Sequence, residues 1–192
     1  MKLEHVILGL LSLRPFSGYE LGKYLQQETA ASAVRPRAHL TQIYRVLGRM
    51  VDDGWVRFEV TENDGKPDAK TYRLTEKGEQ ALLAWANSEY KAGPGLPSPE
   101  FAGRFIFAGP LIGRPALARL VRTELEARLD HVARFRGRDR SVGELEPIAA
   151  VDPAIAAWAG DLLHEFGMGT MDRWIEWLRT VLDELETEKE TP

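Results

Sequence analysis

The chain has 192 residues, enough for one ordinary domain or two small ones, and its 44% hydrophobic and 28% charged residues are typical of a globular protein with a buried core. It contains no cysteine, which excludes disulfide frameworks, cysteine nucleophiles, iron–sulfur clusters and thiolate zinc sites. The formal net charge is −4, and taken alone this value argues weakly against a nucleic-acid partner.

Charge is unevenly distributed along the chain. Residues 1–88 carry 12 Lys and Arg against 11 Asp and Glu, a net of +1, whereas residues 89–192 carry 13 against 18, a net of −5. The 23 consecutive residues from Thr29 to Val51 include four arginines and no acidic residue. This segregation indicates that the two halves have different functions.

Apolar residues at helical spacing predict three short helices in the first half of the chain. The first begins at Leu3 and is stopped by Pro15 to Gly18, the second spans about Gly18–Gln27, and the third spans about Ala38–Asp53. Three short helices in series are the frame of a helix-turn-helix, in which the second helix braces the third.

From Trp55 the apolar period changes from 3.6 to 2, which predicts a β-hairpin. The expected strands are Trp55–Thr61 and Lys70–Leu74, joined by a turn-rich loop over Glu62–Asp68. Thr75 is the expected N-cap of a fourth helix. A hairpin directly after three helices is the wing of a winged helix-turn-helix.

A linker divides the chain, because residues 91–99 contain two glycines and three prolines. Beyond it the pattern is helical, with a phenylalanine-rich segment over Glu100–Ala108, a helix over about Arg114–Arg136 and a long one over about Pro153–Glu186. The predicted fold is therefore mainly α with a small β-hairpin wing. We expect a winged helix DNA-binding domain at 1–90, a linker at 91–99 and a helical dimerisation domain at 100–192.

The third helix has the chemistry of a DNA reader. Gln42, Arg45 and Arg49 form a narrow stripe opposite its apolar face, with Thr41 and Tyr44 beside them. Arginine can donate two hydrogen bonds to guanine, and glutamine can pair with adenine in the same way. An arginine stripe is also compatible with an ordinary solvated helix face, but such faces usually mix both signs of charge. Tyr44 has a second candidate role, half-buried packing.

Three further cations extend this predicted surface. Lys66 at the tip of the hairpin and Lys70 at the start of its second strand bring positive charge toward the DNA backbone or minor groove. Arg37, in the acid-free stretch before the third helix, is a candidate phosphate contact. The alternative function is a helical dimeric protein-interaction module, in which the winged helix binds another protein.

Several motifs occur in the order and spacing of a known family. They are Ser17-Gly18-Tyr19-Glu20-Leu21, Gln42-Ile43-Tyr44-Arg45-Val46-Leu47, Asp53-Gly54-Trp55-Val56, and the stretch from Asp64 to Gly78 with its Pro, Lys, Tyr and Leu-Thr. Over about residues 3–90 the sequence closely resembles the PadR family of transcriptional regulators. The C-terminal half is similar to the longer helical domain of one PadR subgroup.

The resemblance implies a homodimeric winged-helix repressor that binds double-stranded operator DNA with an inverted repeat. Residue by residue, Gln42, Tyr44, Arg45 and Arg49 match the family's recognition helix, and Lys66 and Lys70 match its wing. It also makes a small apolar or aromatic effector a candidate partner, although aromatic residues at helical spacing are more often core than ligand site.

The sequence itself favours dimerisation through the C-terminal half. Apolar residues at steps of three and four near the C-terminus lie close to a coiled-coil seam, and packing within one chain is the alternative for each of them. The expected interface consists of Phe105, Leu120, Leu125, Met171, Trp174, Leu178, Leu182 and Leu185.

An enzymatic function is not expected. The four histidines have no paired metal-ligand spacing, and the sequence contains no P-loop, nucleophile elbow or kinase motif set. We therefore expect no catalytic residue, no metal and no cofactor. With no secretory signal pattern and no apolar run of about 20 residues, the chain is expected to be cytoplasmic and free of membrane contact.

Overall fold

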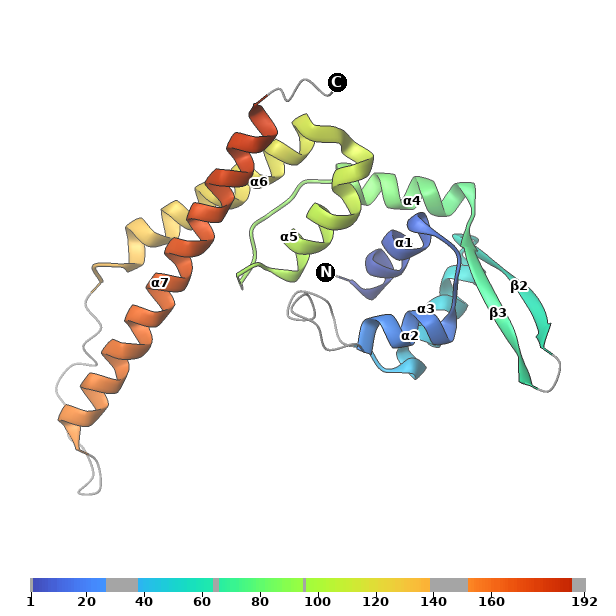
Figure 1. The fold of residues 1–192 in the computed structure, drawn as a ribbon, viewed down its shortest axis with the longest axis horizontal. Helices are drawn as coiled ribbons and strands as arrows, with labels where there is room; N and C mark the ends of the chain where they lie inside the picture. Colours follow the sequence, from blue (N-terminus) through green and yellow to red (C-terminus); the bar gives the residue numbers. More distant parts are fainter. Residues whose placement is uncertain (1, 27–37, 64–65, 95, 139–151, 188–192) are drawn as a thin grey trace. The chain divides into compact units, whose positions relative to one another are not determined.

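The structure is a computed structural model that describes residues 2–26, 38–63, 66–94, 96–138 and 152–187. The chain forms two compact units, Met1–Leu120 and Val121–Pro192. The first unit contains the three N-terminal helices, the sheet and the helices up to the start of α6, and the second contains the rest of α6 together with α7 (Figure 1). The predicted fold class, mainly α with a small β-hairpin, is confirmed.

Three helices form the centre of the first unit, as the apolar spacing predicts. They are α1 (Leu3–Leu13), α2 (Gly18–Gln26) and α3 (Leu40–Asp52). α1 is the most enclosed, with all residues from Val6 to Leu11 buried, because it packs against α3, α4 and the sheet. The core residues of the other two helices are Leu21, Leu25, Ile43, Val46, Leu47 and Met50.

The start of α2 is fixed by a reciprocal capping pair. The Glu20 carboxylate accepts a hydrogen bond from the Ser17 backbone N–H at 2.7 Å, and the Ser17 hydroxyl accepts one from the Glu20 N–H at 3.1 Å. The bond from the Ser17 N–H, with a smaller contribution from Arg14, lowers the pKa of Glu20. The pair therefore sets the point at which the chain leaves β1 and enters α2.

The sheet has three strands, one more than predicted. β1 (Phe16–Ser17) pairs antiparallel with β3 (Lys66–Leu74), which also pairs with β2 (Val56–Asn63), so the strand order is β1-β3-β2. A two-residue strand is too short to show a period of two. The hairpin is also longer than expected: the prediction of a loop over Glu62–Asp68 is wrong, because pairing continues to Asn63 and Lys66, with an irregularity after Thr61.

α4 (Glu76–Asn87) docks closely on the turn that precedes β2. The Thr75 hydroxyl oxygen accepts a hydrogen bond from the Gly78 N–H at 3.1 Å, which confirms the predicted cap. A Cβ atom at Gly78 would lie 2.0 Å from the Trp55 carbonyl oxygen, so only glycine permits this approach. Leu82 and Trp85 on the same helix are buried in the core.

Residues 91–99 and the helical segment that follows them belong to the first unit. The phenylalanine-rich segment predicted over Glu100–Ala108 consists of α5 (Pro99–Gly103) followed by η2 (Arg104–Ala108), a short π-helix. Phe107 and Ala108 belong to the same hydrophobic core as α1. A Cβ atom at Gly9 would lie 2.4 Å from Phe107 Cγ, which shows how closely η2 packs on α1.

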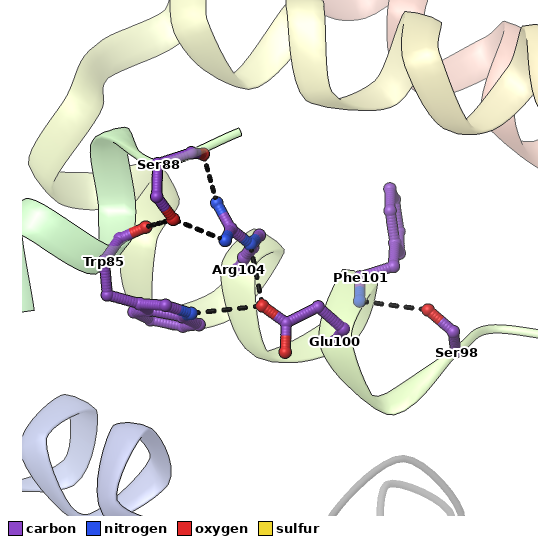
Figure 2. Close-up of polar contacts among 6 residues, drawn as sticks. All are labelled: Trp85, Ser88, Ser98, Glu100, Phe101 and Arg104. Atoms are coloured by element: carbon purple, nitrogen blue, oxygen red, sulfur yellow. Dashed lines mark hydrogen bonds and ion pairs between the residues drawn. The ribbon is translucent and has the colours of Figure 1, made fainter. Parts of the chain in front are cut away.

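One buried arginine joins α4 to η2 (Figure 2). Arg104 donates from Nε to a Glu100 carboxylate oxygen at 2.9 Å, from Nη1 to the Ser88 carbonyl oxygen and from Nη2 to the Ser88 hydroxyl, both at 2.8 Å. The Trp85 indole N–H donates to the same Glu100 oxygen at 3.1 Å, and these two donors lower the pKa of Glu100 against the effect of its burial. A buried charge with all these partners holds the end of α4 in one position.

The second unit is a pair of antiparallel helices. α6 (Gly109–Phe135) has a non-helical residue at Gly113, and α7 (Pro153–Glu186) has the bounds that the sequence predicts. Ion pairs join Arg122 to Glu186 and Arg136 to Asp172. Between these pairs lies a fully buried carboxylate, Glu124, which accepts from Arg128 of α6 and from the indole N–H of Trp174 of α7.

We expect opposite effects from two glycine-to-alanine substitutions in the first unit. G78A places a methyl group against the Trp55 carbonyl and should lower the free energy of unfolding by about 1–3 kcal/mol. G48A, at an exposed position inside α3 with nothing within 4 Å, should raise it by about 0.5–1 kcal/mol. Urea denaturation monitored by circular dichroism measures both, and equal effects at the two positions would contradict the packing described for Gly78.

Candidate nucleic-acid interface

α3 has one buried face and one exposed face. Ile43, Leu47 and Met50 are completely buried, whereas all five predicted DNA contacts of this helix are exposed. These five are Thr41, Gln42, Tyr44, Arg45 and Arg49. Since the buried face determines the rotation of the helix about its axis, the sequence stripe becomes a continuous solvent-facing surface.

Gln42 and Tyr44 also make contacts within the protein. The Gln42 side-chain oxygen accepts a hydrogen bond from the His39 backbone N–H at 3.1 Å, which leaves the two amide donors for another partner. The Tyr44 ring lies against Gly18 of α2, because a Cβ atom there would be 2.4 Å from Tyr44 Cε1. Its side chain is nevertheless 48% exposed, so Tyr44 both packs α2 on α3 and faces solvent.

The structure distinguishes the two arginines of the stripe. Among the residues that the structure describes, none pairs with the exposed Arg45 guanidinium. Arg49, one turn later, donates from Nη2 to Glu4 Oε2 of α1 at 2.6 Å. As far as the described residues are concerned, Arg45 is thus available to a ligand, and Arg49 has an internal partner.

Three of the predicted DNA contacts are cations that lie outside α3. Lys70 is exposed on β3, and its Nζ lies 4.3 Å from the centre of the Phe58 ring on β2, a cation–π contact that supports the side chain. Lys66 is the first residue of β3 and pairs with Asn63 at the tip of the hairpin. Arg37 lies outside the described residues.

Tyr19 is an exposed aromatic that the sequence interpretation did not select. It follows Gly18 at the start of α2, and 67% of its surface is exposed. Gly18 contacts Tyr44, one of the predicted DNA contacts. Tyr19 follows Gly18 in sequence and is therefore adjacent to that surface. Helical spacing already contains the signal, since Leu21 and Leu25 share the buried face of α2 and Tyr19 is not on it.

A second feature that the sequence interpretation missed is a cavity of about 530 Å³ in the first unit. Its apolar lining comes from Leu11, Leu74, Leu82, Leu83 and Leu111, and its basic lining from Arg14, Arg57 and Arg73. Arg57 and Arg73 are directly opposite each other in the register of β2 and β3. Like charges in that position repel, and Glu59, which pairs with Arg73 at 3.6 Å, offsets part of this repulsion. Glu79 adds an acidic group to the lining, and only the register of the hairpin reveals the arginine pair.

The predicted dimer residues lie mostly inside the chain. Leu120, Leu125, Met171 and Leu178 are buried, and Phe105, Trp174, Leu182 and Leu185 are partly buried. Trp174 stacks on Trp177, and its indole N–H is bonded to Glu124, so this face of α7 turns toward α6. Large apolar side chains are instead exposed on the first half of α7, at Ile155, Trp158, Leu162, Leu163 and Phe166.

The described ranges contain neither a metal-binding cluster nor a membrane-spanning helix. There, no cluster of three or more His, Asp or Glu side chains has a geometry that could hold a metal ion. In the same part of the chain, no helix combines the length and apolar character required to cross a bilayer.

Comparison with known proteins gives consistent matches. The chain is similar to the negative transcriptional regulator PadR of Bacillus subtilis, with 25% identity over 181 residues that cover 94% of this chain and 95% of that protein. It is also similar to the probable transcriptional regulator Rv1176c of Mycobacterium tuberculosis, with 28% identity over 201 residues, 98% of this chain and all of that protein. The chain is also similar to a solved structure of Bacillus subtilis PadR in complex with operator DNA. The match covers 96% of this chain and 99% of the PadR chain, at 22% identity and a TM-score of 0.45.

A family model identifies the N-terminal part directly. Residues 7–84 match the transcriptional regulator PadR-like family, and this range contains α2, α3 and the complete hairpin together with most of α1 and α4. The resemblance seen in the sequence motifs is thereby confirmed. Over its winged helix-turn-helix, the chain is thus similar to the transcriptional regulator PadR-like family.

Proposed function

We propose that this regulator binds double-stranded operator DNA in a sequence-specific manner, with α3 in the major groove and the β2–β3 hairpin beside it. The observation that carries the proposal is the exposed face of α3, where Arg45 has no partner among the described residues and no acidic residue occurs between Thr29 and Val51. In this proposal Arg45 and the Gln42 amide contact base edges. The remaining residues of the site contact the DNA backbone and so fix the position of the protein on the duplex. They are Arg37, Thr41, Tyr44, Arg49, Lys66 and Lys70.

The proposed site of action is the cytoplasm, and the proposed effect on transcription is repression. A bound protein that covers promoter DNA excludes the polymerase, and this is the simplest consequence of tight, specific binding. The name of the Bacillus subtilis relative, a negative transcriptional regulator, supports this direction.

We also propose that the regulator is a homodimer that binds an inverted repeat, because a two-fold symmetric protein matches a two-fold symmetric site. Ile155, Trp158, Leu162 and Phe166 lie within about 80° of one another around α7, at 100° per residue. Trp158 is 62% exposed and Phe166 is 70% exposed. A stripe of large apolar side chains exposed to this degree favours burial against a second copy of the same helix.

The buried residues of the predicted interface favour the same dimer indirectly, because they hold α7 against α6. Met171 and Leu178 of that set, together with Ile175, which was not predicted, are buried in the second half of α7 and hold it against α6. The buried Glu124–Arg128–Trp174 group favours one register of this contact, since shifting α7 along α6 would take the Trp174 indole donor away from the buried carboxylate, whereas Arg128 stays beside it on the same helix. The exposed stripe is thus held on a rigid support.

Finally, we propose that the cavity of the first unit binds a small organic acid as effector. Its five leucines suit an apolar body, and the two opposed arginines on β2 and β3 suit a carboxylate, which would add to the ion pair that Arg73 makes with Glu59. The volume of about 530 Å³ lies within the range of small-molecule sites. This proposal gives the expected apolar effector a charged head.

The substitution R45A tests the DNA-binding proposal. We expect it to weaken binding of a fluorescent duplex from the protein's own promoter by about 1–3 kcal/mol, because the partner of a base edge or phosphate is lost. Fluorescence anisotropy measures the affinity, and R179A, which removes an exposed arginine of α7, is the charge-matched control. Wild-type affinity should also fall steeply with salt. A specific complex that ignores salt, with R45A unchanged, would favour the protein-interaction function instead.

The substitution L162E tests the dimer. A carboxylate in the centre of the apolar stripe should convert the dimer to monomer at micromolar concentration, since burying an unpaired charge costs several kcal/mol. Analytical ultracentrifugation gives the mass directly. L13E, at an exposed leucine of α1, serves as the control and should leave the mass unchanged. If L162E sediments like the wild type, this stripe is not the interface.

Octanoate and 1-octanol, which share an alkyl chain and differ in charge, test the effector site. We expect octanoate to bind at least tenfold more tightly by isothermal titration calorimetry, because a guanidinium–carboxylate bond is worth about 1.5–3 kcal/mol. R57Q should abolish the difference, whereas R179Q should preserve it. Equal affinity for the acid and the alcohol would eliminate the proposed role of the arginines.

A further inference from the structure

Glu4 of α1 makes an ionic contact with α3. Its carboxylate is only 17% exposed, and Oε2 accepts from Arg49 Nη2 at 2.6 Å. Its other oxygen, Oε1, lies 3.7 Å from Lys2 Nζ. Glu4 is in the first turn of α1, where the helix dipole favours a negative charge. It therefore forms a stable ionic contact between α1 and the predicted DNA-reading helix.

The pair changes the electrostatics of α3. Arg49 is 58% exposed and belongs to the same stripe as Arg45, so the sequence alone predicts the same DNA-contacting role for both arginines. With Glu4 at 2.6 Å, however, Arg49 and its partner together carry no net charge. A DNA phosphate that approaches this end of α3 must compete with a carboxylate already in place.

We propose that Glu4 is an intramolecular competitor of DNA for Arg49, and that it limits the affinity of this regulator for nucleic acid. The proposal rests on the DNA-binding function proposed above. When phosphate takes Arg49, Glu4 retains Lys2, which is itself 75% exposed and close enough to pair. The exchange thus leaves no carboxylate without a cation, so it can occur without unfolding α1.

The substitution E4Q tests this inference, because it removes the charge and keeps the shape of the side chain. We expect E4Q to bind both promoter and random duplexes roughly two- to fivefold more tightly, the range of a partly exposed ion pair. The slope of log affinity against log salt should become steeper by up to about one, since one more arginine is free to displace a counterion.

Three further variants separate this role from simpler explanations. E76Q removes an exposed carboxylate of α4 and changes the net charge equally, so it should have little effect if the contact with Arg49 matters. In an R49Q background, E4Q should no longer tighten binding. E4D keeps the negative charge but shortens the side chain, and it should show a smaller gain in the same direction; it also replaces E4Q if that variant does not fold.

The results distinguish the two proposals. If wild-type protein shows no salt-dependent DNA binding, the proposed function fails. If the wild type binds but E4Q equals the wild type or E76Q, or if E4Q still tightens binding in the R49Q background, then Glu4 does not compete for Arg49 and this inference alone is overturned.

Discussion

The packing of one face of α3 against the core is the interaction on which the rest of this structure depends. Ile43, Leu47 and Met50 are completely buried, in the same cluster as the residues Val6 to Leu11 of α1. At about 25 cal/mol per Å² of buried apolar surface, three such side chains contribute several kcal/mol, more than any single surface ion pair. Burial therefore fixes the orientation of the helix, and the exposed Arg45 and Tyr44 follow from it.

Much of this fold is predictable because its helices have strong local signals. The bounds of α7 follow directly from Pro153 and the apolar period, and Thr75 caps α4 as its sequence position indicates. The two-residue strand β1 and the extension of the hairpin to Lys66 are not predictable in this way. β1 depends on pairing with β3, a strand distant in sequence, and such pairing leaves no local pattern. The extension of the hairpin is local, but its polar, turn-favouring residues suit a loop equally well.

The candidate site likewise has a part that the sequence pattern predicts and a part that it does not. Helical periodicity places Arg45 and Arg49 on one exposed face, but it contains no information about Glu4, which is 45 residues away and holds only one of them. The opposed Arg57 and Arg73 likewise require the register of the sheet. The apolar period predicts a seam in the second half of α7, whereas most of the exposed large apolar side chains of this helix lie in its first half. Periodicity alone does not distinguish contact with α6 from contact with another chain.

The central claim is that the exposed face of α3 and the adjacent hairpin contact operator DNA. Amide chemical shifts of the full-length protein, recorded while a duplex from its own promoter is added, test this claim most directly. The account predicts that the largest changes fall in α3, at Thr41, Arg45 and their neighbours, and in the hairpin around Lys70. Changes confined to α6 and α7, or no changes at all with promoter DNA, would contradict it.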